Sequence, residues 1–275
     1  MSFLTSFDNT RIFYLYKKGK KPFTLVFLHG IGMNWTEWKK EILYFQKLGF
    51  STLALDLRGH GKSDIPQDFE SYSIEFFYKD LECILKKERI EKFSLIGHSF
   101  GGAIAIVCCM KKEKMPQSVI LVESGSTYPY KHNKLLNLSP YLTHLLRFIS
   151  TNKITKKHFK DFDLSKKGIT LDINFIRNLL QVTPIITIIK ALDNVEKYIF
   201  KNQLKINATL KNLDIPLLVI AGKKDHIFPL KYSRKLVSLN PHAQLKIIEN
   251  ADHFVTVKMP KELCQIMLDF LTSTS

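Results

Sequence analysis

Short apolar runs of strand length alternate with longer stretches of helical periodicity along most of this chain. The runs are rich in β-branched and aromatic residues, and most are nearly continuous, as is typical of strands buried on both faces of a sheet. Strands are predicted over Arg11–Tyr16, Phe23–Leu28, Phe50–Leu55, Phe93–Gly97, Ser118–Val122, Pro216–Ala221 and Gln244–Ile248. The first two of these, joined by short turns, are expected to form an antiparallel start.

The segments between these runs carry apolar residues on helical stripes. Helices are predicted over Thr36–Lys47 with Thr36 as the N-cap, over Ser73–Glu88, and over Pro260–Phe270, where proline occupies a favourable first-turn position. Strands that alternate with helices in this way indicate the α/β class. We therefore expect a mostly parallel twisted sheet with helices on both faces.

One stretch interrupts the alternation. No strand signal occurs from about residue 126 to 210, where apolar helical segments follow one another at Leu135–Ile149, Ile173–Leu180 and Ile185–Tyr198. We interpret residues 126–210 as a helical insertion, and residues 1–125 and 211–275 as the core that it interrupts. The length of 275 residues suits one large domain, or one domain that carries an insertion.

The composition excludes several classes of protein. With 45% hydrophobic and 24% charged residues, the chain is neither disordered nor fibrous. No apolar run reaches the roughly 18 residues that a membrane span needs, and the N-terminus has no uninterrupted apolar segment of secretory length. The 4 cysteines include no C-x-x-C pair and are too few for a disulfide scaffold. We therefore expect a cytoplasmic protein without a membrane span.

The chain is strongly basic, with 41 Lys+Arg against 25 Asp+Glu and a formal net charge of +16. Such a charge attracts anionic partners, and nucleic acid is the first to consider. Nearly all the cations are lysines in dispersed pairs, whereas arginine is the residue of bidentate phosphate recognition. We interpret the charge as a solvated lysine-rich surface and expect no nucleic-acid partner.

The strongest motif is Gly97-His98-Ser99-Phe100-Gly101, a G-x-S-x-G pattern between a predicted strand and a predicted helix. A nucleophile on such a turn has a strained backbone and needs neighbours without side chains. Gly97 and Gly101 provide that room. The pattern predicts Ser99 as a nucleophile, the alternative being a glycine-rich structural turn.

A serine hydroxyl becomes reactive only beside a base that an acid orients. Among the 9 histidines, His253 lies in the loop after the last predicted strand, at the same sheet edge as Ser99, and we predict that it is the base. Asp225 follows the penultimate strand at that edge, which gives the order Ser…Asp…His known for this motif. Glu123 ends another strand there and is the alternative acid or a pocket-wall carboxylate.

With these residues the sequence resembles the α/β-hydrolase fold superfamily, and within it carboxylesterases, monoacylglycerol lipases and pimeloyl-acyl-carrier methyl ester esterases. The match covers most of residues 1–125 and 211–275. It includes the turn His29-Gly30-Ile31-Gly32 and the glycine-rich segment Asp56–Asp64, which we interpret as a structural loop.

The resemblance implies an eight-stranded sheet and a helical cap formed by the insertion. It also implies an oxyanion hole made by the backbone N–H groups of Ile31 and Phe100, with His29 and Gly30 supporting the first of them. Epoxide hydrolases and haloalkane dehalogenases of this fold carry aspartate at the position of Ser99, so serine separates this chain from them. No dinucleotide fingerprint, P-loop or metal-ligand motif occurs, and we expect neither cofactor nor metal.

We therefore predict a serine esterase that cleaves a small-molecule carboxylic ester through an acyl-enzyme. Lysine and arginine outnumber acidic residues in the insertion, and a basic cap suits an acidic acyl carrier protein. A carrier-linked acyl methyl ester is thus a further candidate substrate. Two alternatives stay open: a carbon–carbon bond hydrolase with the same triad, and a ligand receptor without turnover on the same scaffold.

Overall fold

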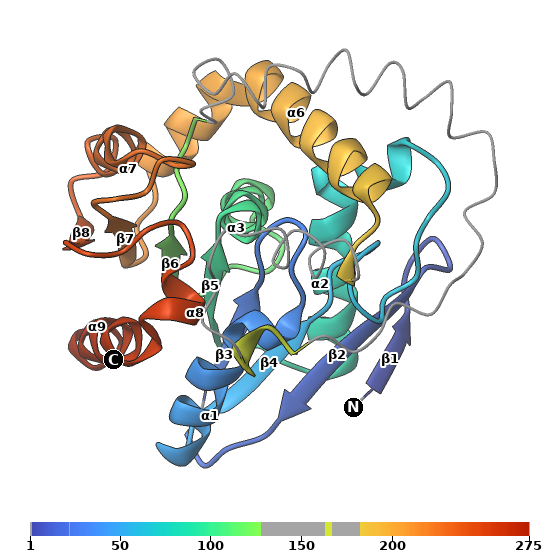
Figure 1. Cartoon of the computed structure of the whole chain (residues 1–275), viewed down its shortest axis with the longest axis horizontal. Helices are drawn as coiled ribbons and strands as arrows, with labels where there is room; N and C mark the ends of the chain where they lie inside the picture. Colours follow the sequence, from blue (N-terminus) through green and yellow to red (C-terminus); the bar gives the residue numbers. More distant parts are fainter. Residues whose placement is uncertain (1, 22, 128–162, 167–181, 275) are drawn as a thin grey trace.

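A mixed β-sheet runs through the centre of the molecule (Figure 1). The computed structural model describes residues 2–21, 23–127, 163–166 and 182–274. Within these residues the sheet has eight strands in the order β1-β2-β4-β3-β5-β6-β7-β8. Its strands are β1 (Ser2–Thr5), β2 (Arg11–Lys17), β3 (Thr24–Leu28), β4 (Ser51–Leu55), β5 (Phe93–His98), β6 (Ser118–Val122), β7 (Leu217–Gly222) and β8 (Ala243–Ile248).

The strands from β3 onward are parallel. β4 and β5 flank β3, and β6, β7 and β8 follow in spatial order. The carboxyl ends of parallel strands meet at one edge of a sheet, which is where ligands bind in open α/β sheets. The loops after β3, β5, β6, β7 and β8 therefore open toward the same region of the molecule.

An antiparallel start is present, but the predicted pairing of Arg11–Tyr16 with Phe23–Leu28 is wrong. The segment predicted over Arg11–Tyr16 is β2, and it pairs antiparallel with β4 on one side and β1 on the other. β3 is flanked by β4 and β5 and has no free edge for β2. β1 was not predicted, because a four-residue strand with exposed ends carries little periodic signal.

Helices cover both faces of the sheet, as expected. The helices α2 (Ile74–Lys87), α3 (Phe100–Lys111), α6 (Ile185–Lys211) and α7 (Leu230–Val237) lie on one face (Figure 1). The helices α1 (Lys39–Lys47) and α9 (Pro260–Ser273) pack together on the other. The short α8 (Val255–Lys258) precedes α9, and the 3-10 helices are η1 (Trp35–Trp38), η2 (Glu70–Tyr72) and η4 (Leu164–Lys166).

The core has two layers because successive side chains of a strand point to opposite faces. In β3, Val26 and Leu28 join the cluster that contains residues of α2 and α3. Leu25 and Phe27 join the cluster that contains residues of α1 and α9. This burial on both faces explains the continuous apolar runs and confirms the α/β class.

Helix starts differ from the expectation at one position. Asn34, not Thr36, is the N-cap: it precedes η1, and its side-chain oxygen accepts the Thr36 N–H at 3.0 Å. α1 follows only at Lys39, because a 3-10 turn occupies the residues between. The Thr36 hydroxyl instead accepts the N–H of Leu164 at 3.0 Å.

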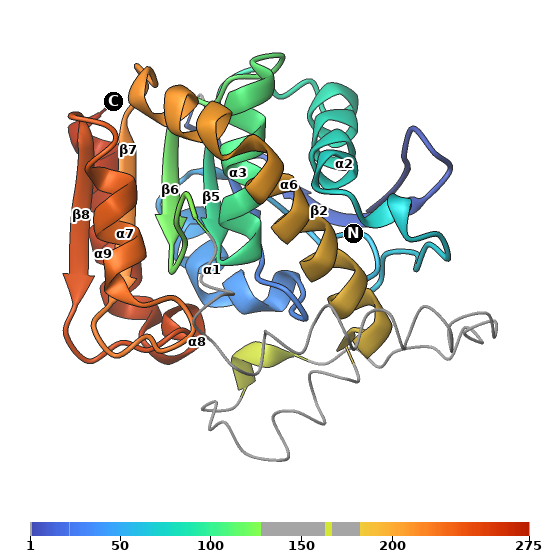
Figure 2. The same ribbon diagram turned by 90° about the horizontal axis from the view of Figure 1, so that it is seen from above.

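Part of the predicted insertion is described. The predicted helices Leu135–Ile149 and Ile173–Leu180 lie outside the described residues, whereas the predicted helix Ile185–Tyr198 is the first part of α6. α6 contacts α3 and α2 and passes in front of α3 in Figure 2, and its buried Val195, Ile206 and Leu210 join their core cluster. The division of the chain at residues 126 and 210 stays a prediction. In the described part of the chain, no helix has both the length and the apolar character to span a membrane.

Candidate active site

Ser99 stands on the sharp turn between β5 and α3. Its backbone has φ 49° and ψ −110°, a conformation that L-residues rarely adopt. The turn is possible because its flanking residues have no side chains: a Cβ on Gly97 would lie 2.5 Å from the carbonyl carbon of Gly101. A Cβ on Gly101 would in turn lie 2.7 Å from the carbonyl carbon of Leu28 in β3. The nucleophile candidate is thus held on a tight junction of strand and helix.

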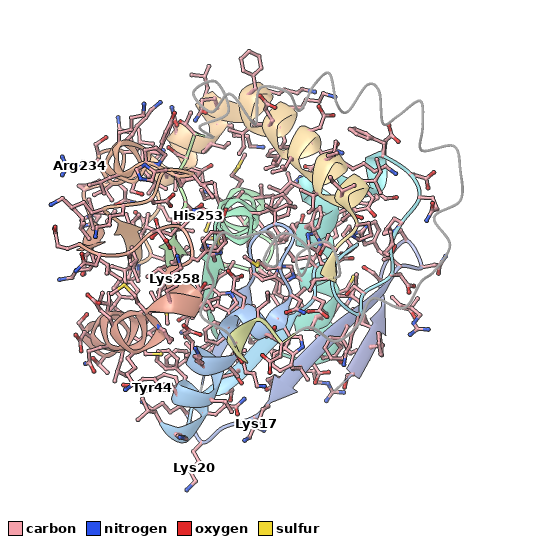
Figure 3. The ribbon with its side chains drawn as sticks, in the orientation of Figure 1. Lys17, Lys20, Tyr44, Arg234, His253 and Lys258 are labelled. Carbon is pink, nitrogen blue, oxygen red and sulfur yellow. The ribbon has the colours of Figure 1, made fainter. Side chains whose placement is uncertain are left out.

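His253 lies against Ser99, although 154 residues separate them in the chain. It follows β8 and comes just before α8, and Figure 3 shows it near the centre of the molecule. Its Nε2 is 3.1 Å from Ser99 Oγ, and its Nδ1 is 2.8 Å from Asp225 Oδ2. Because the carboxylate accepts the Nδ1–H, the lone pair of Nε2 faces the serine hydroxyl.

Asp225, in the loop after β7, is fixed from both sides. Its Oδ1 accepts the N–H groups of Ile227 and Phe228, each at 2.7 Å. Burial raises the pKa of Asp225, but the contact with His253 outweighs burial and brings the pKa to about 2. The carboxylate is therefore ionised at neutral pH and holds the imidazole in one orientation.

Glu123, the alternative acid, lies at the end of β6 in a left-handed conformation with φ 46°. Its Oε1 accepts the N–H of Gly222 at 2.7 Å, so it bonds to the start of the Asp225 loop. Burial raises the pKa of Glu123 to about 10, with the nearby Asp225 adding to the shift. The structure thus brings Asp225 to His253, and Glu123 beside Asp225 as a protonated neighbour.

The turn after β3 packs directly on Ser99. A Cβ on Gly30 would lie 3.6 Å from the Cβ of Ser99. The N–H of Leu57 donates to His29 Nε2 at 2.9 Å, so His29 Nδ1 carries its hydrogen and donates it to Gly30 O at 2.8 Å. A trans peptide points its N–H opposite to its C=O. Holding Gly30 O therefore fixes the direction of the Ile31 N–H.

The direction of the second predicted donor, the N–H of Phe100, is likewise fixed through the carbonyl of its own peptide. The carbonyl of Ser99 accepts the N–H of Gly102 at 3.0 Å and the hydroxyl of Ser124 at 3.1 Å. The N–H of Phe100 belongs to that peptide and points away from these partners. Phe100 is the first residue of α3, where backbone N–H groups have no partner within the helix. Such preorganised amides suit a developing negative charge.

Two further residues of the site were missed by the sequence analysis. Glu37 in η1 is buried, and its Oε2 accepts the N–H of Gly30 at 2.8 Å. Its Oε1 is 2.6 Å from Nδ1 of His98, which precedes Ser99. The only signal in the sequence is an acidic residue between two tryptophans, Trp35 and Trp38, which by itself does not indicate a partner.

The segment Asp56–Asp64 serves the fold. Arg58 is fully buried and pairs with Asp80 at 2.6 Å and with Asp8 at 2.8 Å. It links the N-terminal hairpin to α2 and touches none of the candidate catalytic groups named above. Within the described residues, no cluster of three or more His, Cys, Asp or Glu side chains is arranged to hold a metal ion.

Comparison with known proteins agrees with the fold. A family described as alpha/beta hydrolase fold matches residues 24–258. Human protein ABHD8 is 22% identical over 262 residues, which cover 93% of this chain and 56% of ABHD8. Epoxide hydrolase 3 of Xenopus tropicalis is 24% identical over 298 residues, which cover 95% of this chain and 74% of that protein. An esterase from Exiguobacterium antarcticum is similar with a TM-score of 0.77 at 18% identity, over 98% of this chain and 99% of the esterase.

The relatives and the family match support different conclusions about this chain. The chain spans about half the length of ABHD8, at 56%, so the whole activity of that protein does not transfer. The similarity to the solved esterase, at 18% identity, concerns the fold alone. The family match, however, covers residues 24–258, which include every candidate residue of the site. This chain belongs to the α/β-hydrolase fold family.

Proposed function

We propose that this protein is a serine carboxylesterase. The observation that supports the proposal is the chain of contacts from Asp225 Oδ2 through His253 to Ser99 Oγ, at 2.8 and 3.1 Å. A serine hydroxyl, a base with a free lone pair and an ionised orienting acid are the parts that acyl transfer requires. The N–H groups of Ile31 and Phe100 add donors for the charge that develops on the substrate oxygen.

In the first half-reaction, Ser99 Oγ attacks the ester carbonyl carbon while His253 Nε2 takes the hydroxyl proton. The carbonyl π electrons move to oxygen, and this oxyanion accepts hydrogen bonds from Ile31 and Phe100. Asp225 stabilises the imidazolium that forms. When the tetrahedral intermediate collapses, the ester C–O bond breaks and His253 gives its proton to the leaving alcohol.

In the second half-reaction, water takes the place of the alcohol. His253 removes a proton from the water as its oxygen attacks the acyl-enzyme carbonyl. The same two amides hold the second oxyanion. Collapse releases the carboxylic acid and returns the proton to Ser99, so the enzyme is regenerated without a cofactor.

Serine chemistry argues against an epoxide substrate, although epoxide hydrolase 3 of Xenopus tropicalis is among the relatives. An aspartate that opens an epoxide forms an ester, which activated water can hydrolyse. Serine in the same role forms an alkyl ether, which has no carbonyl for water to attack. With serine at position 99, such a reaction stops after one turnover.

The acidic carrier stays a proposal for the substrate of the same site. Much of the basic charge that motivates it belongs to residues outside those described. Within the described part, α6 presents exposed Lys197, Lys201 and Lys205. A carrier-linked acyl ester brings its negative charges with it, so the basic surface increases its rate of encounter with the enzyme. The cytoplasmic location likewise stays a prediction.

The test is hydrolysis of p-nitrophenyl esters over a series of acyl chain lengths by the wild-type protein and by Ser99→Ala. We expect multiple turnovers by the wild type and a fall in kcat of about 10⁴-fold or more in the variant, with the same thermal unfolding midpoint within a few degrees. Turnover that survives Ser99→Ala rejects the proposal. A single stoichiometric burst indicates a receptor, and cleavage of vinylogous diketones but not of esters indicates a carbon–carbon bond hydrolase.

A further inference from the structure

The pair Glu37–His98 lies beneath the candidate active site and takes no part in the mechanism above. Both side chains are buried, with exposed fractions of 0% and 1%. They come from different elements, because Glu37 belongs to η1 and His98 is the last residue of β5. Glu37 Oε1 and His98 Nδ1 are 2.6 Å apart.

The contacts of His98 determine its protonation. Nδ1 faces the carboxylate of Glu37, and Nε2 lies 2.8 Å from the backbone carbonyl of His253. Both partners are acceptors only, so an imidazolium, with a hydrogen on each ring nitrogen, is the form of His98 that suits both contacts. Burial lowers the pKa of His98, but the charge of Glu37 outweighs it and the net shift is upward.

Glu37 holds a second segment through its other oxygen. Oε2 accepts the N–H of Gly30, at the start of the turn that presents Ile31. Oε1 also accepts the hydroxyl of Thr256 in α8 at 3.2 Å. Burial raises the pKa of Glu37, yet its contact with His98 gives a net downward shift, so the carboxylate is ionised.

The pair therefore joins two parts of the site that are far apart in the chain. On one side is the turn that carries the predicted oxyanion donor Ile31, and on the other is the loop that carries His253. Packing leaves little slack: a Cβ on Gly30 would lie 2.8 Å from His98 Nδ1. The rings of His98 and His253 are 5.0 Å apart between centroids.

We propose that the Glu37–His98 ion pair is a positioning device that sets the oxyanion turn and the His253 loop at a fixed separation. The inference rests on the proposed esterase function. A buried ion pair adds little stability, because the loss of hydration offsets the attraction of the charges, but it fixes geometry. Here it fixes the distance between the base and one oxyanion donor.

The first test is Glu37→Gln, which keeps the size of the side chain and removes its charge. His98 then loses the partner of its second hydrogen, and the two segments lose their common anchor. We expect kcat for a p-nitrophenyl ester to fall about 10- to 100-fold, as small misplacements of catalytic groups do, with KM little changed. Rates are normalised to the number of serines that a fluorophosphonate titrates.

The matched control is Glu41→Gln. Glu41 lies four residues further along and is equally buried, but within the described part of the chain its carboxyl oxygens make no hydrogen bond to the turn or to His98. The same substitution there, at a carboxyl group that is protonated in the fold, is expected to leave kcat unchanged. An equal loss of kcat in both variants assigns the effect to the replacement of a buried glutamate in general and overturns the proposal.

A second variant and an NMR measurement keep the proposal testable if Glu37→Gln does not fold. Thr256→Val removes one hydrogen bond to Glu37 without unpairing a charge, and we expect a smaller loss of kcat at unchanged KM. NMR of ¹⁵N-histidine-labelled protein is expected to show two ring N–H signals for His98 in the wild type, one of them lost in Glu37→Gln. This signature is independent of turnover.

The outcomes separate the two proposals. Activity that survives Ser99→Ala rejects the esterase mechanism and leaves the His98 signals in place. A Ser99-dependent esterase whose kcat is unchanged in Glu37→Gln and in Thr256→Val rejects positioning. If Glu37→Gln does not fold, kcat of Thr256→Val decides alone, with a loss supporting the proposal and an unchanged value overturning it.

Discussion

Two neighbouring carboxyl groups, Asp225 and Glu123, carry different charges at neutral pH. Burial raises the pKa of each, but the contact with His253 lowers that of Asp225, and the ionised Asp225 raises that of Glu123 further. Like charges this close do not both ionise. The environment of each carboxyl group therefore sets its charge, and the type of side chain alone does not reveal which carboxyl orients the base.

Replacing Asp225 by Asn tests this assignment. The amide has the shape of the carboxylate, but it does not hold the Nδ1–H tautomer of His253 or stabilise the imidazolium. We expect kcat on an activated ester to fall about 10³- to 10⁴-fold. Glu123→Gln, which keeps a neutral side chain beside Gly222, is the control and is expected to retain most activity. A larger loss in Glu123→Gln than in Asp225→Asn would make Glu123 the orienting acid.

Glu41 provides a prediction about stability. It is buried in α1, and neither carboxyl oxygen has a hydrogen-bond partner among the described residues. Burial raises its pKa well above the ordinary range of glutamate. The folded protein thus binds a proton that the unfolded chain releases, and the free energy of unfolding falls as pH rises above the unfolded pKa.

Glu41→Gln removes this titration. Relative to the wild type, its free energy of unfolding is expected to increase with pH above about 5, by at most about 1.4 kcal/mol per pH unit. Urea unfolding of both proteins at about five pH values between roughly 4 and 9 measures this difference in the free energy of unfolding. A difference that does not change with pH would show that Glu41 is ionised in the fold.

At the scale of elements, the junction of β5 and α3 has no room for an added side chain at its glycines. Gly101→Ala tests it, because the new Cβ would lie 2.7 Å from the backbone carbon of Leu28. α3 then has to move away from β3, and Ser99 moves with it. We expect a loss of about 1–3 kcal/mol in the free energy of unfolding, and a loss of esterase activity in the protein that remains folded. Unchanged stability would contradict the close approach.

The sequence predicted most elements because the features that position the site are local. The parallel strands are continuous apolar runs, and the turn at Ser99 is a G-x-S-x-G pattern between a strand and a helix. β1 was missed because it is short and its ends are exposed. The pairing of β2 with β4 was missed because periodicity gives the face of a strand but not its neighbour.

Some residues of the candidate site could likewise be predicted from the sequence, and others could not. Ser99, Asp225 and His253 were predicted because each follows a strand at the shared edge of the sheet. Glu37 and His98 were not, because their contact joins residues from different elements and leaves no periodic mark. Threonine suits an N-cap, so the sequence favours Thr36 for that position, whereas Asn34 is the residue that caps the 3-10 turn.

At the scale of the whole molecule, the sheet order gathers loops that are distant in sequence, and basic residues outnumber acidic ones in the predicted cap. Lys156 and Lys157 belong to the predicted cap. If the cap docks an acidic carrier, reversing both to glutamate slows a carrier-linked ester but leaves a free ester unchanged. The measurement is kcat/KM for the two substrates at low and high salt.

The matched control reverses Lys17 and Lys20, which are exposed and lie far from His253 (Figure 3). It changes the net charge by the same amount at a distant surface. We expect it to affect both substrates alike and only weakly, since salt screens charges beyond about 10 Å. Equal slowing of the carrier-linked ester by both pairs would leave net charge, and not docking at the cap, as the cause.

The proposed mechanism requires that the hydroxyl of Ser99 becomes covalently acylated. Brief reaction with a p-nitrophenyl ester, an acid quench and peptide mass spectrometry test it directly. We expect an acyl adduct on the peptide that contains Ser99, and none on that peptide in Ser99→Ala. Sustained ester turnover by the wild type with the acyl group on another residue would contradict it.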